Sequence, residues 1–167
     1  MSFACQIIAS TIKRRQQITI LTTKLLNTRE GGIMATRYLY LVRHGNYESQ
    51  DPDDELGGSL SALGREQAER TGEYFKDFPI TAIYGSTMRR AFETAKIISA
   101  HFREIEVQPT RELWECIPTI PPRFEALFAI KSPELTPDKV AEQRKYADIA
   151  FDRFFVPPDD PYDEHVM

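Results

Sequence analysis

A cation and an imidazole, Arg43 and His44, follow directly after the apolar run Tyr38–Val42. A short run of β-favouring residues of this kind is typical of a buried strand. Gly45 comes next, and a glycine has no side chain to block the approach of a ligand to the backbone. Open α/β sheets bind ligands at the carboxyl ends of their strands, so a ligand site is predicted here. Taken alone, an Arg-His-Gly tripeptide is more often structural, and the interpretation depends on the residues that follow.

Two more charged residues come after segments with a strand pattern. Arg90 opens a predicted helix, where its guanidinium and the helix amino end can both bind a phosphate. Glu115 stands between Trp114 and Ile117, and such apolar neighbours would raise the pKa of its carboxyl into the range of a general acid. The alternatives are a solvated loop glutamate and, for Arg89, a solvated helix arginine. Donors at several strand ends together predict a pocket for a dianion.

Strands and helices must alternate along the chain to position these residues. Later strands are predicted at 81–84 and 105–108, and helices at 62–76, 88–100 and 136–155. The residues predicted to cap these helices are Ser61, then Ser86 or Thr87, then Thr136. The last helix is expected to bury Val140, Ala147, Phe151 and Phe154. This alternation predicts an α/β fold, a three-layer sandwich with a mainly parallel central sheet.

Composition limits the class of protein. A chain of 167 residues with 41% hydrophobic and 11% aromatic residues is expected to form one globular domain. The net charge of -4 does not favour nucleic acid as a partner. Cys5 and Cys116 make neither a disulfide framework nor a zinc set. No apolar run is long enough to span a membrane, and a reducing, cytoplasmic location is expected.

Residues 1–33 differ from the remainder of the chain. They contain five basic residues against the single acid Glu30, and they are rich in threonine and isoleucine. Such a segment fits a transit-type presequence, which would target the chain to an organelle, or an amphipathic helix on an anionic membrane. The favoured interpretation is a disordered segment or mis-annotated leader, with the domain covering 34–167 and the true start at Met34.

Three motifs together resemble the histidine phosphatase superfamily, also called the phosphoglycerate mutase-like family. They are Arg43-His44-Gly45, the segment 60–68 (Leu-Ser-Ala-Leu-Gly-Arg-Glu-Gln-Ala) and the segment 86–95 (Ser-Thr-Met-Arg-Arg-Ala-Phe-Glu-Thr-Ala). The match covers most of residues 37–167. The segments 64–69 and 113–118 resemble the branch that contains the mitochondrial serine/threonine phosphatase. The Glu-Arg-His-Tyr-Gly signature of true mutases is not found, which favours a phosphatase.

The resemblance implies a role for each candidate residue. His44 would attack the phosphorus and carry a phosphohistidine intermediate, which water then hydrolyses. Arg43 and Arg90 would hold the equatorial oxygens, with Asn46 as an extra donor. Glu115 would protonate the leaving oxygen and then activate water. No metal or cofactor is implied. The substrate class is a phosphorylated small molecule or a phosphoprotein, and neither the substrate nor the oligomeric state can be derived from the sequence.

One feature of the resembled family has no counterpart in these residues. The family places a second histidine at the end of a later core strand, and 163–167 resembles only the start of that strand. His165 falls too early for the role and is predicted to be solvent-exposed. A truncated sheet, missing its last strand or strands, is therefore expected, with impaired activity and a tendency to aggregate. The alternative is a catalytically inactive phosphate-binding or interaction module.

Overall fold

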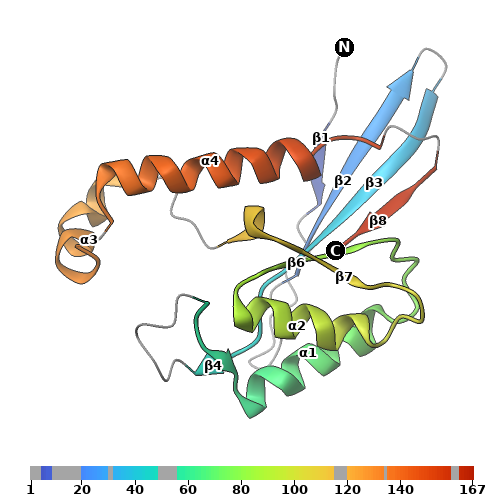
Figure 1. Cartoon of the computed structure of the whole chain (residues 1–167). Coiled ribbons are helices and arrows are strands. Elements are labelled where there is room, and N and C mark those ends of the chain that lie inside the picture. Colours follow the sequence, from blue (N-terminus) through green and yellow to red (C-terminus); the bar gives the residue numbers. More distant parts are fainter. Residues whose placement is uncertain are drawn as a thin grey trace.

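Strands at the centre of the molecule are covered by helices on both faces. The computed structural model describes residues 5–8, 20–29, 32–48, 56–114, 120–133, 135–158 and 162–167. Helices α1 (Ala62–Phe75) and α2 (Arg89–Ser99) lie on one side, and α4 (Pro137–Phe154) lies on the other (Figure 1). The predicted three-layer α/β class is confirmed.

These strands form a sheet of order β1-β2-β3-β8 and a two-stranded sheet of order β6-β7. Strands β1 (Cys5–Ile8), β2 (Ile20–Arg29) and β3 (Gly32–Val42) are antiparallel neighbours. On its other edge β3 pairs in parallel with β8 (Glu164–Val166), and β6 (Ile83–Ser86) pairs in parallel with β7 (Val107–Thr110). A parallel bridge between Ala82 and Val166 joins β8 to the chain just before β6, and so connects the two sheets. The pairing is thus parallel from β3 to β7, as predicted.

Strands are also present in the N-terminal segment. Where the structure describes residues 1–33, they form strands, and β2 pairs along almost all of β3. β-Branched residues favour a pleated strand, which explains why the Thr- and Ile-rich sequence is not irregular there. Strand β3 begins at Gly32 and so runs through Met34. The domain boundary at Met34 and the leader interpretation stay predictions.

Hydrophobic contacts cover both faces of the sheet. Successive strand residues point to opposite faces, so Leu39 packs against Phe154 of α4, while Tyr40 packs with Phe75 of α1. The predicted burial of Phe154 is confirmed, at 9% exposed. Phe151 was expected beside it, but it is 59% exposed and stacks on the ring of Phe155. The prediction for Phe151 is therefore wrong, because its ring packs along α4 itself and not against the sheet.

Local capping signals set two of the three helix starts as predicted. The hydroxyl of Ser61 accepts the Gly64 N–H at the start of α1, and Thr136 does the same for Lys139 in α4. Helix α2 differs, since Met88 is its N-cap and no side chain caps it. The short helix α3 (Glu125–Lys131) follows a 3-10 turn at Pro122–Phe124 and was not predicted.

Strand β8 leaves His165 half-buried against β3. Its ring stacks on Tyr38 with 4.5 Å between centroids, and its Nδ1 lies 2.8 Å from the Tyr40 hydroxyl. The predicted solvent exposure is wrong, because β8 lies between β3 and β6 and directs this side chain onto β3. The Thr81 N–H also donates to the His165 carbonyl oxygen at 2.8 Å. The prediction that 163–167 starts a core strand is consistent with this position.

His165 should make stability sensitive to mild acid. Burial lowers the pKa of His165 from its ordinary 6.5, and Asp163 opposes this shift. The unfolded chain then binds the proton more readily, so this contribution is complete above pH 6.5 and is lost as the pH falls through the folded value. Urea unfolding should show a lower midpoint at pH about 5.5 than at about 7.5. The His165→Gln chain should lose less over that interval, and equal losses in both chains would contradict the prediction.

Candidate active site

The loop after β3 holds His44 with a defined tautomer. His44 Nδ1 lies 2.8 Å from the carbonyl oxygen of Gly45. A carbonyl oxygen can only accept, so Nδ1 carries the proton and Nε2 carries the lone pair. Arg90 confirms this assignment from the other side of the ring, because its Nε–H donates to His44 Nε2 at 3.1 Å. The imidazole therefore presents a nucleophilic nitrogen beside a fixed positive charge.

Arg90 is a buried cation in the first turn of α2. Only 5% of this residue is exposed, although arginine is normally left in water. Its guanidinium lies over the ring of Tyr47, with 4.7 Å from Cζ to the ring centroid. Arginine has five N–H donors in a planar fork. A planar fork of this kind suits a pair of phosphate oxygens.

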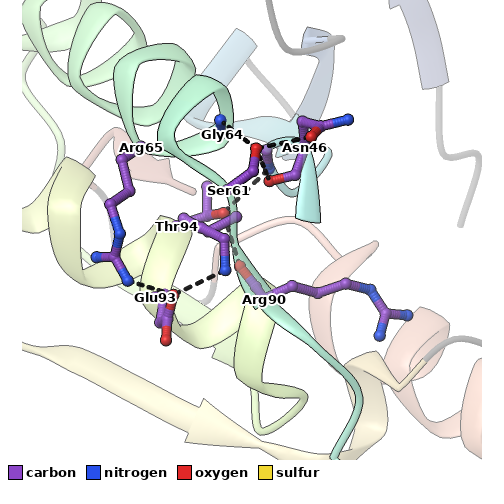
Figure 2. A network of polar contacts seen from close by, with 9 residues as sticks. Asn46, Ser61, Gly64, Arg65, Arg90, Glu93 and Thr94 are labelled. Atoms are coloured by element: carbon purple, nitrogen blue, oxygen red, sulfur yellow. Dashed lines mark hydrogen bonds and ion pairs between the residues drawn. The ribbon is translucent and has the colours of Figure 1, made fainter. Parts of the chain in front are cut away.

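Thr94 ties the His44 loop to α2. Its Oγ1 accepts the Gly45 N–H at 3.1 Å and donates to the Arg90 carbonyl oxygen at 2.7 Å. One buried hydroxyl thus fixes the distance between the backbone of the histidine loop and the backbone of Arg90 (Figure 2). Sequence reasoning missed this residue. The available signal was its spacing, since Thr94 stands four residues after Arg90, one turn along the same helix face.

The start of α1 holds the loop from the other side. Asn46 accepts from the Ser61 hydroxyl through Oδ1 at 2.7 Å, and its backbone oxygen accepts the Ser61 N–H at 3.1 Å (Figure 2). The backbone of Gly64 lies directly against this loop: a Cβ built on Gly64 would be 1.9 Å from the Asn46 oxygen. The Gly-Arg-Glu-Gln-Ala motif therefore needs glycine for close packing of two backbones.

A small hairpin continues from the loop to α1. Strand β4 (Tyr47–Glu48) pairs with β5 (Ser59–Leu60), and the Leu60 N–H donates to the Glu93 carboxylate of α2 at 3.0 Å. Glu93 also pairs with Arg65 of α1 at 3.1 Å (Figure 2). The acidic residue of the motif after Arg90 thus fastens the hairpin, and its role is structural.

The predicted site residues can now be placed. His44 and Arg90 are brought together, as the dianion pocket requires. Arg43 is exposed at the end of β3, beside His44 in the chain. Asn46 is exposed and held at the start of α1, with its carboxamide oxygen turned to Ser61. Glu115 lies outside the described residues, so its role stays a prediction.

A cavity of about 290 Å³ lies elsewhere, beneath α4. Its lining includes Arg37, Arg153 and Glu164, together with apolar residues of β6 and β8. Both cations are already neutralised, since Arg37 pairs with Glu164 at 2.6 Å and Arg153 pairs with Glu112 at 2.8 Å. Neither His44 nor Arg90 lines this cavity. The reactive nitrogen and the buried cation lie at the other site, so the chemistry is assigned there.

Comparison with known proteins agrees with this site. Residues 39–118 match the family model of the histidine phosphatase superfamily (branch 1). Mitochondrial serine/threonine-protein phosphatase PGAM5 of Xenopus tropicalis is 38% identical over 89 residues, 52% of this chain and 32% of that protein. The Mus musculus protein of the same name is 33% identical over 121 residues, 65% of this chain and 42% of that protein. The chain thus spans less than half the length of these relatives.

The chain is also similar to a further curated protein and to a solved structure. Phosphoglycerate mutase-like protein 4 of Arabidopsis thaliana is 38% identical over 82 residues, 46% of this chain and 35% of that protein. A solved phosphoglycerate mutase from Plasmodium falciparum is 31% identical, covers 64% of this chain and 61% of its own, and has a TM-score of 0.46.

The predicted cytoplasmic location is corrected by these relatives, because the matched phosphatases are mitochondrial by name. The sequence offered an organelle-targeting role for residues 1–33 as its alternative. Within the described part of the chain, no helix combines the length and the apolar character needed to cross a bilayer.

The family match includes the residues that build the site. His44, Thr94 and Arg90, with the Ser61 cap and the Gly64 contact, all fall within the matched residues. The three sequence motifs and the geometry around His44 and Arg90 agree with the resemblance to this superfamily. Residues 39–118 of this chain carry the match to the histidine phosphatase superfamily.

Proposed function

We propose that this chain is a phosphomonoester hydrolase that works through a phosphohistidine on His44. The observation that supports it best is the pairing of the His44 Nε2 lone pair with the buried Arg90 guanidinium, 3.1 Å apart. A nucleophile next to a fixed cation is the arrangement that phosphoryl transfer needs, since catalysis there is mostly positioning and charge stabilisation.

The reaction proceeds in two displacements. The hydrogen bond from Arg90 Nε to His44 Nε2 breaks as Nε2 attacks the phosphorus. An N–P bond forms, and the bond from phosphorus to the ester oxygen breaks. The leaving oxygen takes a proton from a general acid. Water then attacks the phosphorus and gives its proton to the same group, the N–P bond breaks, and inorganic phosphate leaves with the imidazole restored. The Nδ1–H bond to the Gly45 carbonyl fixes the tautomer of the neutral ring in which Nε2 carries the lone pair.

The remaining roles follow the expectations from the sequence. Arg90 turns its terminal nitrogens to the equatorial oxygens, where charge develops in the transition state. Arg43 and Asn46 add donors from the same loop, and Glu115 supplies and then removes the proton. The Asn46 carboxamide has its oxygen committed to Ser61, which leaves its NH₂ group as the donor.

The substrate is a phosphorylated small molecule or a phosphoprotein. The names of the matched phosphatases favour a phosphoserine or phosphothreonine side chain and an organellar location. Among the described residues, Arg43, Asn46 and Tyr47 are exposed around the half-buried His44, which favours a bulky leaving group.

Trapping the intermediate tests the proposal. The chain is incubated with p-nitrophenyl phosphate, denatured in alkali because phosphohistidine is acid-labile, and measured by intact mass. We expect one added phosphoryl group, and peptide mapping should place it on His44. The His44→Asn chain serves as the blank.

Two outcomes would overturn the proposal. A phosphoryl group on another residue, retained in the His44→Asn chain, would assign the chemistry elsewhere. Inorganic phosphate binding without any adduct, and without release of p-nitrophenol, would show a non-catalytic phosphate-binding module.

A further inference from the structure

We infer that Tyr47 and Gly57 form a cradle that sets the position of the Arg90 guanidinium and thereby the affinity of the site for phosphate. The inference rests on the proposed function of the same site and adds two positioning residues to it. Neither residue belongs to the phosphate-binding set predicted from the sequence. Both belong to the segment between β3 and α1, so this segment would control a residue of α2.

Tyr47 contacts both members of the reactive pair. Its ring lies under the Arg90 guanidinium, 4.7 Å from Cζ, and meets the His44 ring edge-on, with 5.3 Å between centroids and an 81° angle. The ring face attracts the cation, because its quadrupole is negative there. The backbone of Tyr47 is fixed by its pairing with Leu60 across the β4–β5 hairpin. One aromatic ring therefore sets the spacing between the nucleophile and its cation.

Gly57 confines the end of the same guanidinium. A Cβ built on Gly57 would lie 2.5 Å from Arg90 Nη1, so the glycine backbone occupies the space in which that nitrogen could move. Its φ of 71° is a left-handed conformation that favours glycine. The neighbouring Leu56 carbonyl oxygen accepts the Arg89 N–H at 2.9 Å, which holds this turn on α2.

The arrangement has a direct consequence for binding. The proposed function assigns the Arg90 guanidinium to the phosphate, and the Nε of the same group is directed to His44. An arginine side chain has several rotatable bonds, and fixing them costs entropy when a ligand binds. A guanidinium already held between a ring and a backbone has lost that freedom beforehand. The cradle should therefore raise phosphate affinity without touching the phosphate.

Substitution at Tyr47 tests the cradle through binding. Calorimetry with inorganic phosphate on the full chain should show about tenfold weaker affinity in Tyr47→Leu, the loss expected for one cation–π contact. Tyr47→Phe keeps the ring and should recover most of the affinity. Tyr146→Leu on α4 is the matched control, since Tyr146 is 41% exposed and Tyr47 is 40% exposed. That control should bind phosphate like the wild type.

A spectroscopic readout separates positioning from general loss of structure. The Arg90 Nε–H signal in ¹⁵N-labelled protein, assigned from its absence in Arg90→Lys, should be sharp in the wild type and broadened in Tyr47→Leu. Gly57→Ala should broaden the same signal and weaken phosphate binding, because its Cβ displaces Nη1. Thermal unfolding of each variant reports whether the fold is intact.

The outcomes for the two proposals are distinguishable. Equal phosphate affinity in the wild type and Tyr47→Leu, or no recovery in Tyr47→Phe, would overturn the cradle. No phosphate binding by the wild type would overturn it as well. A wild type that binds phosphate, shows the Tyr47 effect and forms no adduct on His44 would retain the cradle and overturn the hydrolase proposal.

Discussion

Replacing Arg90 by alanine is expected to slow phosphohistidine formation by about a thousandfold, the upper range for removing one preorganised donor to a developing anion. The variant loses the charge that stabilises the equatorial oxygens and the Nε–H donor that orients His44 Nε2. Rapid quench with p-nitrophenyl phosphate, in which the adduct is measured as intact mass against time, gives the rate directly.

Arg89→Ala is the matched control for Arg90→Ala. The two arginines are neighbours in the first turn of α2, but Arg89 is exposed, whereas only 5% of Arg90 is exposed. The Arg89 N–H bond to Leu56 comes from the backbone and survives the substitution. Adduct formation in Arg89→Ala should stay within about threefold of the wild type. Equal losses in the two variants would mean that general positive charge, and not the position of Arg90, drives the reaction.

Gly64→Ala should destabilise the chain by about 3 kcal/mol, although alanine normally stabilises a helix by about 1 kcal/mol relative to glycine. The new Cβ would lie 1.9 Å from the Asn46 oxygen and 2.9 Å from its backbone carbon and nitrogen. Because these are backbone atoms, the start of α1 must move away from the loop. The bond from the Ser61 N–H to the Asn46 oxygen would then break.

Gly72→Ala in the same helix provides the comparison. There the added Cβ would meet the ring of His101, with 2.2 Å to Cδ2. A side chain can rotate away, and doing so costs its exposed pairings with Glu69 at 2.9 Å and with Glu73 at 3.9 Å. The gain in helix propensity offsets this, so stability should change by less than about 1 kcal/mol. Urea unfolding of both variants measures the difference, and similar losses would refute the backbone argument for Gly64.

Local signals explain what could be predicted from the sequence. The hydroxyls of Ser61 and Thr136 cap their helices whatever the remainder of the chain does, so both starts were placed correctly. Strand β6 and helix α2 were placed to within about two residues, because an apolar run beside a periodic pattern is a local property. The pairing of His44 with Arg90 followed from the rule that strand ends meet at one edge of a parallel sheet.

The other features of the site depend on long-range contacts. Nothing near Thr94 in the sequence shows that its hydroxyl accepts from Gly45, and nothing near Tyr47 shows that Arg90 lies on its ring. These residues meet because the tertiary fold packs the segment after β3, including the β4–β5 hairpin, against α2. The exposure of Phe151 also could not be predicted from the local sequence. Periodicity identifies the apolar face of a helix, but it does not show which residues cover that face. Glu115, outside the described residues, stays a prediction from the sequence.

The central position of β8 has a consequence for the folding rate. It pairs with β3 across a separation of 127 residues, as in the bond from Arg37 to Glu164, and it also bridges β6. Sheets that depend on such distant pairings fold slowly, because the loop must close before the contacts form. Until β8 arrives, the facing edges of β3 and β6 have unpaired N–H and C=O groups. Refolding at high protein concentration should therefore lose material to edge-to-edge association during this interval.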